Sequence, residues 1–340
     1  MTRCDFMWFN ICRRLSLIAA IGVVATSVGI ANAQETYTHK NYRVGGYKIT
    51  IFSKPEDNSG GSIRIVPGMK NTLWFPEGAL GTIVSFTLKG VATAFTVPGG
   101  TANSLAEGSN NRMWFTEFNT DKVGSVSSAG KFKLYDTTDS PTKSNQMVLA
   151  SDGNVWFATD NDGIGRTTPK GKSTFFSISN NAFQPTAVTM GPNNEIWFAE
   201  WAGPNVGYVT TNGTVKEFSA GFGSNSNTFG IAYGSDGRIW FCDPQNTRIG
   251  AINTDGSGLT SYSAGLTGQA DSIVAGPDGN LYFGEFNGAV GRITTTGKIK
   301  ELPLPQTEGS FPVLGITVGP DNNIWFSNNA HAQIGRLKIK

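Results

Sequence analysis

Carboxylates recur at one fixed position along this chain, three residues after the first aromatic of a Trp-Phe or Tyr-Phe pair. The position holds Glu77, Glu117, Thr159, Glu200, Asp243, Glu285 and Asn328. Carboxylates around one opening could bind Mg2+ or Ca2+ through oxygen, or hold one carboxyl protonated as an acid or base. We take Glu117, Glu200, Asp243 and Glu285 as candidate metal ligands. The alternative is structural: an acid after a strand often caps the next loop by accepting N–H bonds, and its recurrence favours this role.

A second position, eleven residues before each leading aromatic, carries chemically mixed side chains. It holds Ile63, Asn103, Asn145, Thr186, Phe229, Asp271 and Leu314. Such variety suits a ligand surface better than a structural requirement, so we expect the two asparagines, Thr186 and Phe229 to bind a ligand with polar and apolar parts. The alternative is a solvated opening that binds nothing. Asp271 and Glu285 lie in the same repeat and form the best candidate acid pair.

Two further side chains fall outside the repeat pattern. His331 follows Trp325 by six residues, in the same class of loop as the acids. It is the candidate general base, although a lone histidine in a loop usually has no such role. Trp201 directly follows Glu200 and could stack on a sugar ring or an apolar ligand, or else pack against the next repeat.

The aromatic pairs that locate these positions recur almost evenly. Their first members are Trp74, Trp114, Trp156, Trp197, Trp240, Tyr282 and Trp325, at intervals of 40 to 43 residues. Each unit alternates short apolar or β-branched runs with turns such as Pro277-Asp278-Gly279, which is typical of a four-stranded antiparallel propeller blade. We therefore predict an all-β fold, a single seven-bladed β-propeller over residues 34–340. Both candidate positions would then face one mouth of the central channel.

The two ends of the chain predict how the ring closes. After Trp325 the sequence supplies only a third strand, Ile334–Ile339. The segment Gly46–Phe52 copies the fourth-strand pattern before the first repeat begins. We expect this N-terminal strand to complete the last blade, which removes the open sheet edges that invite aggregation.

Residues 280–305 carry the motifs of a known family. The stretches Asn280-Leu281-Tyr282-Phe283-Gly284-Glu285, Val290-Gly291-Arg292-Ile293-Thr294 and Gly297-Lys298-Ile299-Lys300-Glu301-Leu302-Pro303-Leu304-Pro305 resemble the repeat of the virginiamycin B lyase (streptogramin lyase) family. The likeness extends from about residue 44 to residue 340. It implies a seven-bladed propeller that opens a cyclic depsipeptide antibiotic at its ester bond by elimination, with Mg2+.

The resemblance also implies where the catalytic residues should lie. The family uses histidines just before the Gly-Ile of late blades, a glutamate two residues ahead of one of them, and a glutamate at the end of the aromatic strand. The matching positions here hold Asp271, Leu314, Pro312 and Asn328. None of these is the expected histidine or glutamate, so the resemblance predicts the scaffold of the family without its catalytic set.

The N-terminus and the charge balance bear on location and partners. The N-terminal segment contains Arg13-Arg14, an apolar run over residues 15–30 and Ala31-Asn32-Ala33. This pattern predicts a secretory signal peptide over residues 1–33 that is cleaved after Ala33. The alternative is an uncleaved membrane anchor. The mature chain would keep one cysteine, Cys242, and 24 basic against 24 acidic residues. We therefore expect a secreted or periplasmic monomer that binds neither nucleic acid nor, after cleavage, a membrane.

Two functional hypotheses follow. The first is a non-catalytic propeller that binds a small or medium ligand, or a protein partner, at the channel mouth. The second is an enzyme, either a divergent lyase or a lactonase-like hydrolase of a cyclic ester that uses Mg2+ or Ca2+. Its catalytic candidates are His331, Glu285 and Asp271. The residues that replace the expected histidines favour the first hypothesis.

Overall fold

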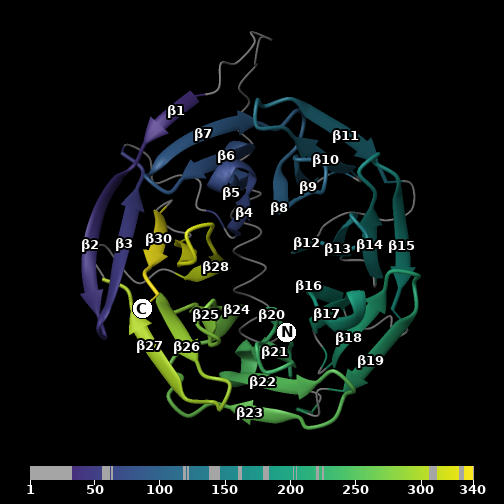
Figure 1. Ribbon diagram of the computed structural model, residues 1–340, viewed down its shortest axis with the longest axis vertical. Helices are drawn as coiled ribbons and strands as arrows, with labels where there is room; N and C mark the ends of the chain where they lie inside the picture. The colour runs from purple at the N-terminus through teal and green to yellow at the C-terminus, as the bar shows by residue number, and fades with distance from the viewer. Residues whose placement is uncertain are drawn as a thin grey trace.

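Seven antiparallel sheets surround a central axis in the computed structural model of this protein (Figure 1). The structure describes residues 33–339 apart from 56–61, 63, 118–119, 121, 138–145, 160–162, 179–183, 202, 204, 220–221, 224–225, 306–311 and 329–332. The predicted all-β, seven-bladed propeller is confirmed. Among the described residues, no helix has the length and apolarity needed to cross a membrane.

The first three blades each run from an inner to an outer strand in chain order. Blade 1 contains β4 (Val66–Gly68), β5 (Thr72–Glu77), β6 (Thr82–Thr87) and β7 (Val91–Thr96). Blade 2 contains β8 (Ala102–Glu107), β9 (Met113–Glu117), β10 (Lys122–Val126) and β11 (Phe132–Asp136). Blade 3 contains β12 (Met147–Leu149), β13 (Val155–Thr159), β14 (Gly163–Thr167) and β15 (Ser173–Ser177).

The next three blades repeat this order. Blade 4 contains β16 (Gln184–Met190), β17 (Glu195–Trp201), β18 (Asn205–Thr210) and β19 (Val215–Ser219). Blade 5 contains β20 (Ile231–Tyr233), β21 (Arg238–Asp243), β22 (Arg248–Asn253) and β23 (Thr260–Tyr262). Blade 6 contains β24 (Ala270–Ala275), β25 (Leu281–Glu285), β26 (Ala289–Ile293) and β27 (Ile299–Pro303). Short 3-10 turns η2 (Met69–Asn71), η3 (Gly78–Leu80), η4 (Pro192–Asn194) and η5 (Pro244–Asn246) lie in blades 1, 4 and 5.

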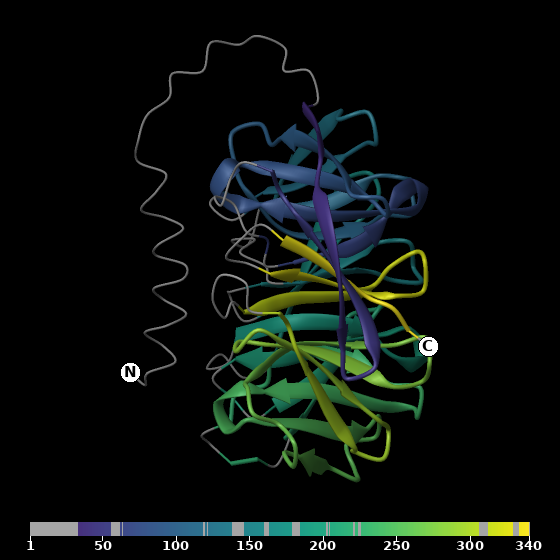
Figure 2. The same cartoon turned by 90° about the vertical axis from the view of Figure 1, so that its left-hand side faces the viewer.

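Blade 7 joins the two ends of the chain. It contains β28 (Val313–Val318), β29 (Ile324–Asn328) and β30 (Gln333–Leu337), followed outward by β3 (Tyr47–Ser53). The pairing of β3 with β30 aligns Ile49 with Leu337 and Phe52 with Ile334. The predicted closure by an N-terminal strand is therefore confirmed. Figure 2 faces this side of the ring and shows the purple N-terminal strands in front of the yellow C-terminal ones.

Two outer strands go beyond the sequence prediction. β2 (Thr38–Val44) pairs outside β3, and β1 (Ala33–Thr36) pairs outside β7 of the neighbouring blade 1. Between them the Tyr37 ring is 3% exposed and meets the edge of Phe86, while its backbone N–H donates to the Gly90 carbonyl at 2.8 Å. Blades 1 and 7 thus each have five strands, and one short segment fastens both sides of the ring's seam.

The repeated motif builds the core between blades. Each leading aromatic is at most 1% exposed, and in blade 5 Trp240 stacks on Tyr262 of the outer strand at 5.3 Å. The following Phe lies over a third-strand glycine: a Cβ on Gly250 would come within 2.4 Å of the Phe241 ring. The Ile-Gly motif is therefore a packing requirement, because only glycine leaves room for that ring.

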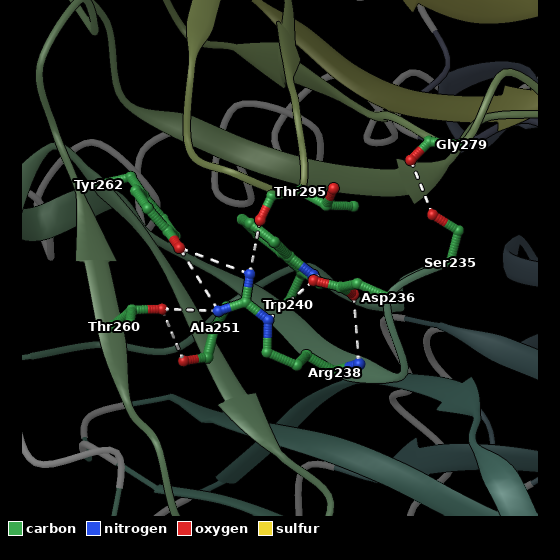
Figure 3. Close-up of polar contacts among 9 residues, drawn as sticks. All are labelled: Ser235, Asp236, Arg238, Trp240, Ala251, Thr260, Tyr262, Gly279 and Thr295. Atoms are coloured by element: carbon green, nitrogen blue, oxygen red, sulfur yellow. Dashed lines mark hydrogen bonds and ion pairs between the residues drawn. The ribbon is translucent and has the colours of Figure 1, made fainter.

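The face that carries the turns between the first and second strands is linked by polar contacts across blade boundaries. Figure 3 shows them between blades 5 and 6. Ser235 Oγ donates to the Gly279 carbonyl at 2.7 Å, and the Arg238 guanidinium donates to the Thr295 carbonyl at 2.7 Å. Arg238 also lies over the Trp240 ring and pairs with Asp236. These contacts hold neighbouring blades together on this face.

Candidate functional site

A cavity of about 300 Å³ lies on the propeller axis, lined from all seven inner strands. Most of its wall is apolar and includes Leu105, Met147, Met190, Phe229 and Ile231. Its charged side chains are Arg64, which precedes β4, and Asp271, which belongs to β24. A largely apolar hollow with a few polar groups is the usual form of a small-molecule site.

The variable position predicted from the sequence coincides with a backbone irregularity. In the inner strands of blades 2, 4, 6 and 7 the register shifts at Asn103, Thr186, Asp271 and Leu314 respectively. A bulged residue has no cross-strand partner, and the bulge re-aims its side chain. This explains why residue type is unconstrained there, and why the inner strands can present different groups at one end of the channel.

Arg64 and Asp271 meet across blade 7. Arg64 Nη1 donates a hydrogen bond to the Leu314 carbonyl at 3.2 Å and lies 3.9 Å from Asp271 Oδ2. Gly315 makes this approach possible, since a Cβ there would come within 3.0 Å of the Arg64 backbone. Gly230 likewise lets β20 approach β24, where its N–H donates to the Asp271 carbonyl at 3.0 Å.

Burial sets the electrostatics of this pair. Asp271 is 3% exposed, and burial raises the pKa of its carboxyl to about 6, although the nearby Arg64 charge opposes the rise. Burial also lowers the pKa of Arg64, against the opposing effect of Asp271. At neutral pH the cavity therefore holds an ionised but loosely joined pair. Cys242 is fully buried, and burial raises the pKa of its thiol well above the ordinary value, which makes it unreactive.

The other predicted ligand residues lie in different places. Phe229 lines the cavity. The Trp201 ring packs edge-on against the Phe229 ring, with the ring centroids 5.5 Å apart, so Trp201 contacts a residue that precedes the next blade. Asn103 and Thr186 are buried but do not line the cavity. The Thr186 hydroxyl is directed to the Ala199 carbonyl at 3.3 Å and the Thr228 carbonyl at 3.4 Å. Asn145 and His331 lie outside the described residues.

Asp243 is a fully paired acid. Its carboxylate accepts hydrogen bonds from Arg248 Nε at 2.7 Å, Ser226 Oγ at 2.6 Å and Asn246 Nδ2 at 3.0 Å. Arg248 begins the third strand of the same blade and also stacks over Phe222 at 3.8 Å. Asp243 therefore holds the blade 5 loop, and these donors occupy the oxygens that a metal would need.

Glu77 and Glu117 also have partners close by, one of them from the neighbouring blade 7. Glu77 accepts from Thr82 Oγ1 at 3.0 Å and lies 3.5 Å from Lys54 Nζ. Burial raises the pKa of Glu77, and the Lys54 charge opposes this. Glu117 accepts a hydrogen bond from Thr120. Both are buried, and neither lines the axial cavity.

Glu200 and Glu285 instead face a second carboxyl. Glu200 is fully buried beside Glu217 of β19, and burial followed by the contact with this second carboxyl raises its pKa to about 8. Glu285 is equally buried and contacts Glu301 of β27, and burial followed by the Glu301 charge raises its pKa to about 8. Two carboxyls satisfy each other only when one holds a proton, so each pair keeps a proton at neutral pH.

The candidate metal ligands do not come together. Among the residues that the structure describes, no group of three or more His, Cys, Asp or Glu side chains is placed to hold a metal ion. Asp243 is saturated by donors, and Glu200 and Glu285 each face one carboxyl inside their own blade. These acids do not fit the oxygen ligand set of Mg2+ or Ca2+, which takes six or more ligands.

Sequence reasoning missed three residues that matter here. Arg64 had a signal, since it is a charged residue between Ile63 and Ile65 at the start of the first inner strand. The fourth strands of blades 4 and 6 share a motif of an apolar residue followed by lysine and glutamate, and its last residue is Glu217 or Glu301. Nothing in either motif reveals that the glutamate turns inward to meet the acid of the second strand.

The fold and the cavity define the class of the protein: a seven-bladed β-propeller with a small-molecule-sized hollow on its axis and one acid–base pair in the wall. The chain matches the model of the virginiamycin B lyase family over residues 39–222 and 163–340. It belongs to that family.

Relatives of known activity are distant in sequence. A virginiamycin B lyase of Nocardia farcinica is 27% identical over 229 residues, which is 66% of this chain and 78% of the relative. A catalytically inactive histidine-to-alanine variant of the Staphylococcus aureus virginiamycin B lyase, solved with quinupristin, superposes with a TM-score of 0.79 at 26% identity, over 86% of this chain and all of that one. The WD40 propeller domain of Doa1 has a TM-score of 0.69 at 12% identity, over 91% of this chain and 98% of that one, and shares the fold alone.

Proposed function

We propose that this protein is an exported, non-catalytic member of the virginiamycin B lyase family that binds a ligand in its axial cavity. The observation that carries this proposal is the Arg64–Asp271 pair beside Leu314. Asp271 and Leu314 occupy the positions where the family resemblance places histidines. Leu314 carries no group that exchanges a proton, so the single Asp271 carboxylate next to a guanidinium stands where the resemblance implies a pair of imidazoles.

The same residues are suited to binding. The cavity wall combines apolar side chains such as Phe229, Met147 and Ile231 with one buried carboxylate. Apolar surface supplies binding free energy, and a few polar groups supply orientation, among which Asp271 is the carboxylate. A small ligand is favoured over a protein partner as the occupant, because the hollow is enclosed by inner strands rather than presented as a flat surface.

Export is supported by the sequence before the propeller. A basic start, an apolar run and Ala31-Asn32-Ala33 precede the first described strand, which begins at Ala33. We propose cleavage after Ala33 and a secreted or periplasmic monomer. N-terminal sequencing of the protein recovered from outside the cytoplasm would test the site, and a mature start well past Tyr37 would contradict it.

The catalytic part of the proposal has a direct test. The purified protein is incubated with quinupristin and Mg2+, and linear product is measured by mass spectrometry, with the S. aureus lyase as positive control. We expect no product above the rate without protein. Linearisation that Asp271→Ala abolishes would overturn the non-catalytic assignment.

One observation favours the enzyme alternative. Glu285 lies opposite Ala270 in the strand register, next to Asp271, and its raised pKa keeps it protonated as a general acid must be. A lyase or lactonase-like hydrolase built on Glu285 predicts turnover of a cyclic ester that Glu285→Gln abolishes. If the reaction also used Mg2+ or Ca2+, either ion would raise the melting temperature of wild type but not of Glu285→Gln. Neither effect is expected under our proposal.

A further inference from the structure

The Asp271 carboxyl lacks a hydrogen-bond donor. It lines the cavity and is 3% exposed, yet no described residue donates a hydrogen bond to it. Its nearest cationic atom, Arg64 Nη1, lies at 3.9 Å, beyond hydrogen-bond distance, and donates instead to the Leu314 carbonyl. Because the carboxyl lines the cavity, its oxygens face the open space of the hollow rather than a donor of the protein. A ligand that brings a donor into the cavity therefore meets an acceptor in its wall.

The size and the wall of the cavity limit what that donor can be attached to. An apolar cavity of about 150 Å³ holds a benzene molecule. The volume of about 300 Å³ here leaves room for one ring with a short side chain. Phe229, Met147 and Ile231 provide apolar contacts for such a body. The occupant is therefore much smaller than a macrocyclic antibiotic.

The Arg64 charge decides the charge of the ligand. Arg64 already compensates Asp271, so the pair is neutral overall. A cationic ligand would bring a second positive charge close to Arg64, and an anionic one would bring a second negative charge close to Asp271. Either charge would lose its hydration in a cavity whose compensating partner is already engaged. A neutral donor gains the hydrogen bond without this cost.

We propose, resting on the binding function above, that the axial cavity selects small neutral molecules with an apolar body and a hydroxyl or amide N–H that the Asp271 carboxylate accepts. A site built to accept a hydrogen bond discriminates strongly against an analogue that lacks the donor, because the buried acceptor then stays unpaired. Asp271 is thus the specificity-determining residue, and the apolar wall contributes affinity without selecting the polar end.

A matched series of probes tests this assignment. Ethylbenzene, 2-phenylethanol, 2-phenylethylammonium and phenylacetate share one body and differ in the end group. Their dissociation constants are measured by ligand-observed NMR titration at pH 7.5, where Asp271 is ionised. We expect 2-phenylethanol to bind at least about tenfold more tightly than ethylbenzene, as for a hydrogen bond to a charged group. Both ions should bind more weakly than the alcohol.

Three variants separate the possible causes. Asp271→Leu should reduce the preference for the alcohol to less than about twofold, because no acceptor remains. Asp271→Asn keeps a carbonyl acceptor of the same size and should retain a preference of at least about threefold. Thr189→Trp fills the cavity and should abolish binding of every probe. Circular dichroism and melting curves confirm that each variant is folded, and Asp271→Asn keeps the test decisive if Asp271→Leu does not fold.

The outcomes distinguish this inference from the proposed function. Ethylbenzene and 2-phenylethanol could instead bind equally tightly, with the binding of both lost in Thr189→Trp. That result would overturn the selectivity assigned to Asp271, but the cavity would still be a binding site. Tighter binding of 2-phenylethylammonium than of the alcohol would overturn the choice of a neutral ligand. If no probe shows saturable binding that Thr189→Trp removes, both the inference and the proposed binding function would be overturned.

Discussion

Asp243 in blade 5 and Glu285 in blade 6 occupy the same position of the repeat, yet their surroundings are opposite. Asp243 accepts from the guanidinium of Arg248, which begins the next strand. The corresponding residue of blade 6 is Ala289, whose side chain offers no donor, and Glu285 lies beside the carboxyl of Glu301 together with Asn287 and Gly268. The Asp243 carboxylate accepts hydrogen bonds from three side chains, whereas burial and then the Glu301 charge raise the pKa of Glu285 to about 8. The residue that begins the third strand thus differs between these two blades, a cationic donor in blade 5 and an alanine in blade 6.

Other blades support this comparison. Thr82 begins β6 and donates to Glu77, and Gln333 begins β30 and is hydrogen-bonded to Asn328 at 3.2 Å. Asn205 begins β18 and lies beside Glu200, but it carries no charge, and Glu200 still faces Glu217. The described acids at the position after the aromatic pair thus have different partners, each close to its own blade, and they do not converge on one point.

The largest effect is expected from breaking the saturated pair. Arg248→Met removes the guanidinium and leaves the Asp243 carboxylate buried among neutral donors. The free energy of unfolding should fall by about 3 kcal/mol, as when one partner of a buried ion pair is lost. Urea denaturation measures it. The double variant Arg248→Met/Asp243→Asn should recover part of the loss, and full additivity would show that the ion pair contributes nothing.

The carboxyl pairs should make stability depend on pH. The folded pKa values of Glu200 and Glu285 are about 8, above the ordinary glutamate value of 4.5. The folded protein therefore holds more protons than the unfolded chain between these limits. This contribution is fully present below pH 4.5 and is lost as pH rises through 8. We expect a loss on the order of 2 kcal/mol per pair between pH 5 and pH 8.

Glutamine variants provide the measurement for this pH effect. Glu200→Gln and Glu285→Gln each replace the proton of the pair with an amide donor. Each should flatten the curve of urea midpoint against pH and exceed wild type at pH 8.5. An unchanged slope in both variants would show that the buried carboxyls are already ionised at neutral pH.

A smaller gain in stability is expected from giving blade 4 the guanidinium that lies next to the buried acid of blade 5. Asn205→Arg places a guanidinium at the position that Arg248 occupies next to Asp243. Glu200 should then ionise, and stability at pH 8.5 should rise by about 1 kcal/mol, with no gain at pH 5. Melting curves at the two pH values test this. A gain of equal size at both would point to packing rather than charge.

The smallest effect provides a control on the opposite face. Ser235→Ala removes the hydrogen bond from Ser235 Oγ to the Gly279 carbonyl across the boundary of blades 5 and 6 (Figure 3). Because this neutral bond is exposed, its loss should cost about 0.5 kcal/mol at every pH. A pH-dependent loss would mean that the carboxyl pairs act through blade docking and not within single blades.

The sequence predicts the fold well because the aromatic pair is itself the packing unit. Trp240 and its equivalents fix the number of blades, and the pattern of Tyr47–Phe52 fixes the closure. The strands β1 and β2 were not predicted, because their exposed residues carry no blade motif. Their positions depend on a tertiary contact, the burial of Tyr37 at the seam.

The candidate site was predicted only in part. Counting residues from each leading aromatic identified Asp271 and Phe229, which line the cavity. The same counting predicted that the acids after the aromatic pairs face this opening, but the described ones do not line the cavity. The carboxyls of Glu200 and Glu285 lie beside Glu217 and Glu301, which are on the fourth strands of the same blades. This placement depends on more than one strand at once. Arg64 was missed because its role depends on Gly315 and Leu314, about 250 residues away.

The seam between blades 7 and 1 has a consequence for synthesis. β3 leaves the ribosome before any complete blade exists, but its partner β30 is made only after blades 1 to 6. The edge of β3 that pairs with β30 must therefore stay unpaired while the intervening blades assemble, although β2 and β1 can already pair with β3 and β7. A product truncated before Gln333 cannot close the ring and keeps exposed strand edges, which marks it for proteolysis or aggregation. Ring closure thus acts as a check that all seven blades have been made.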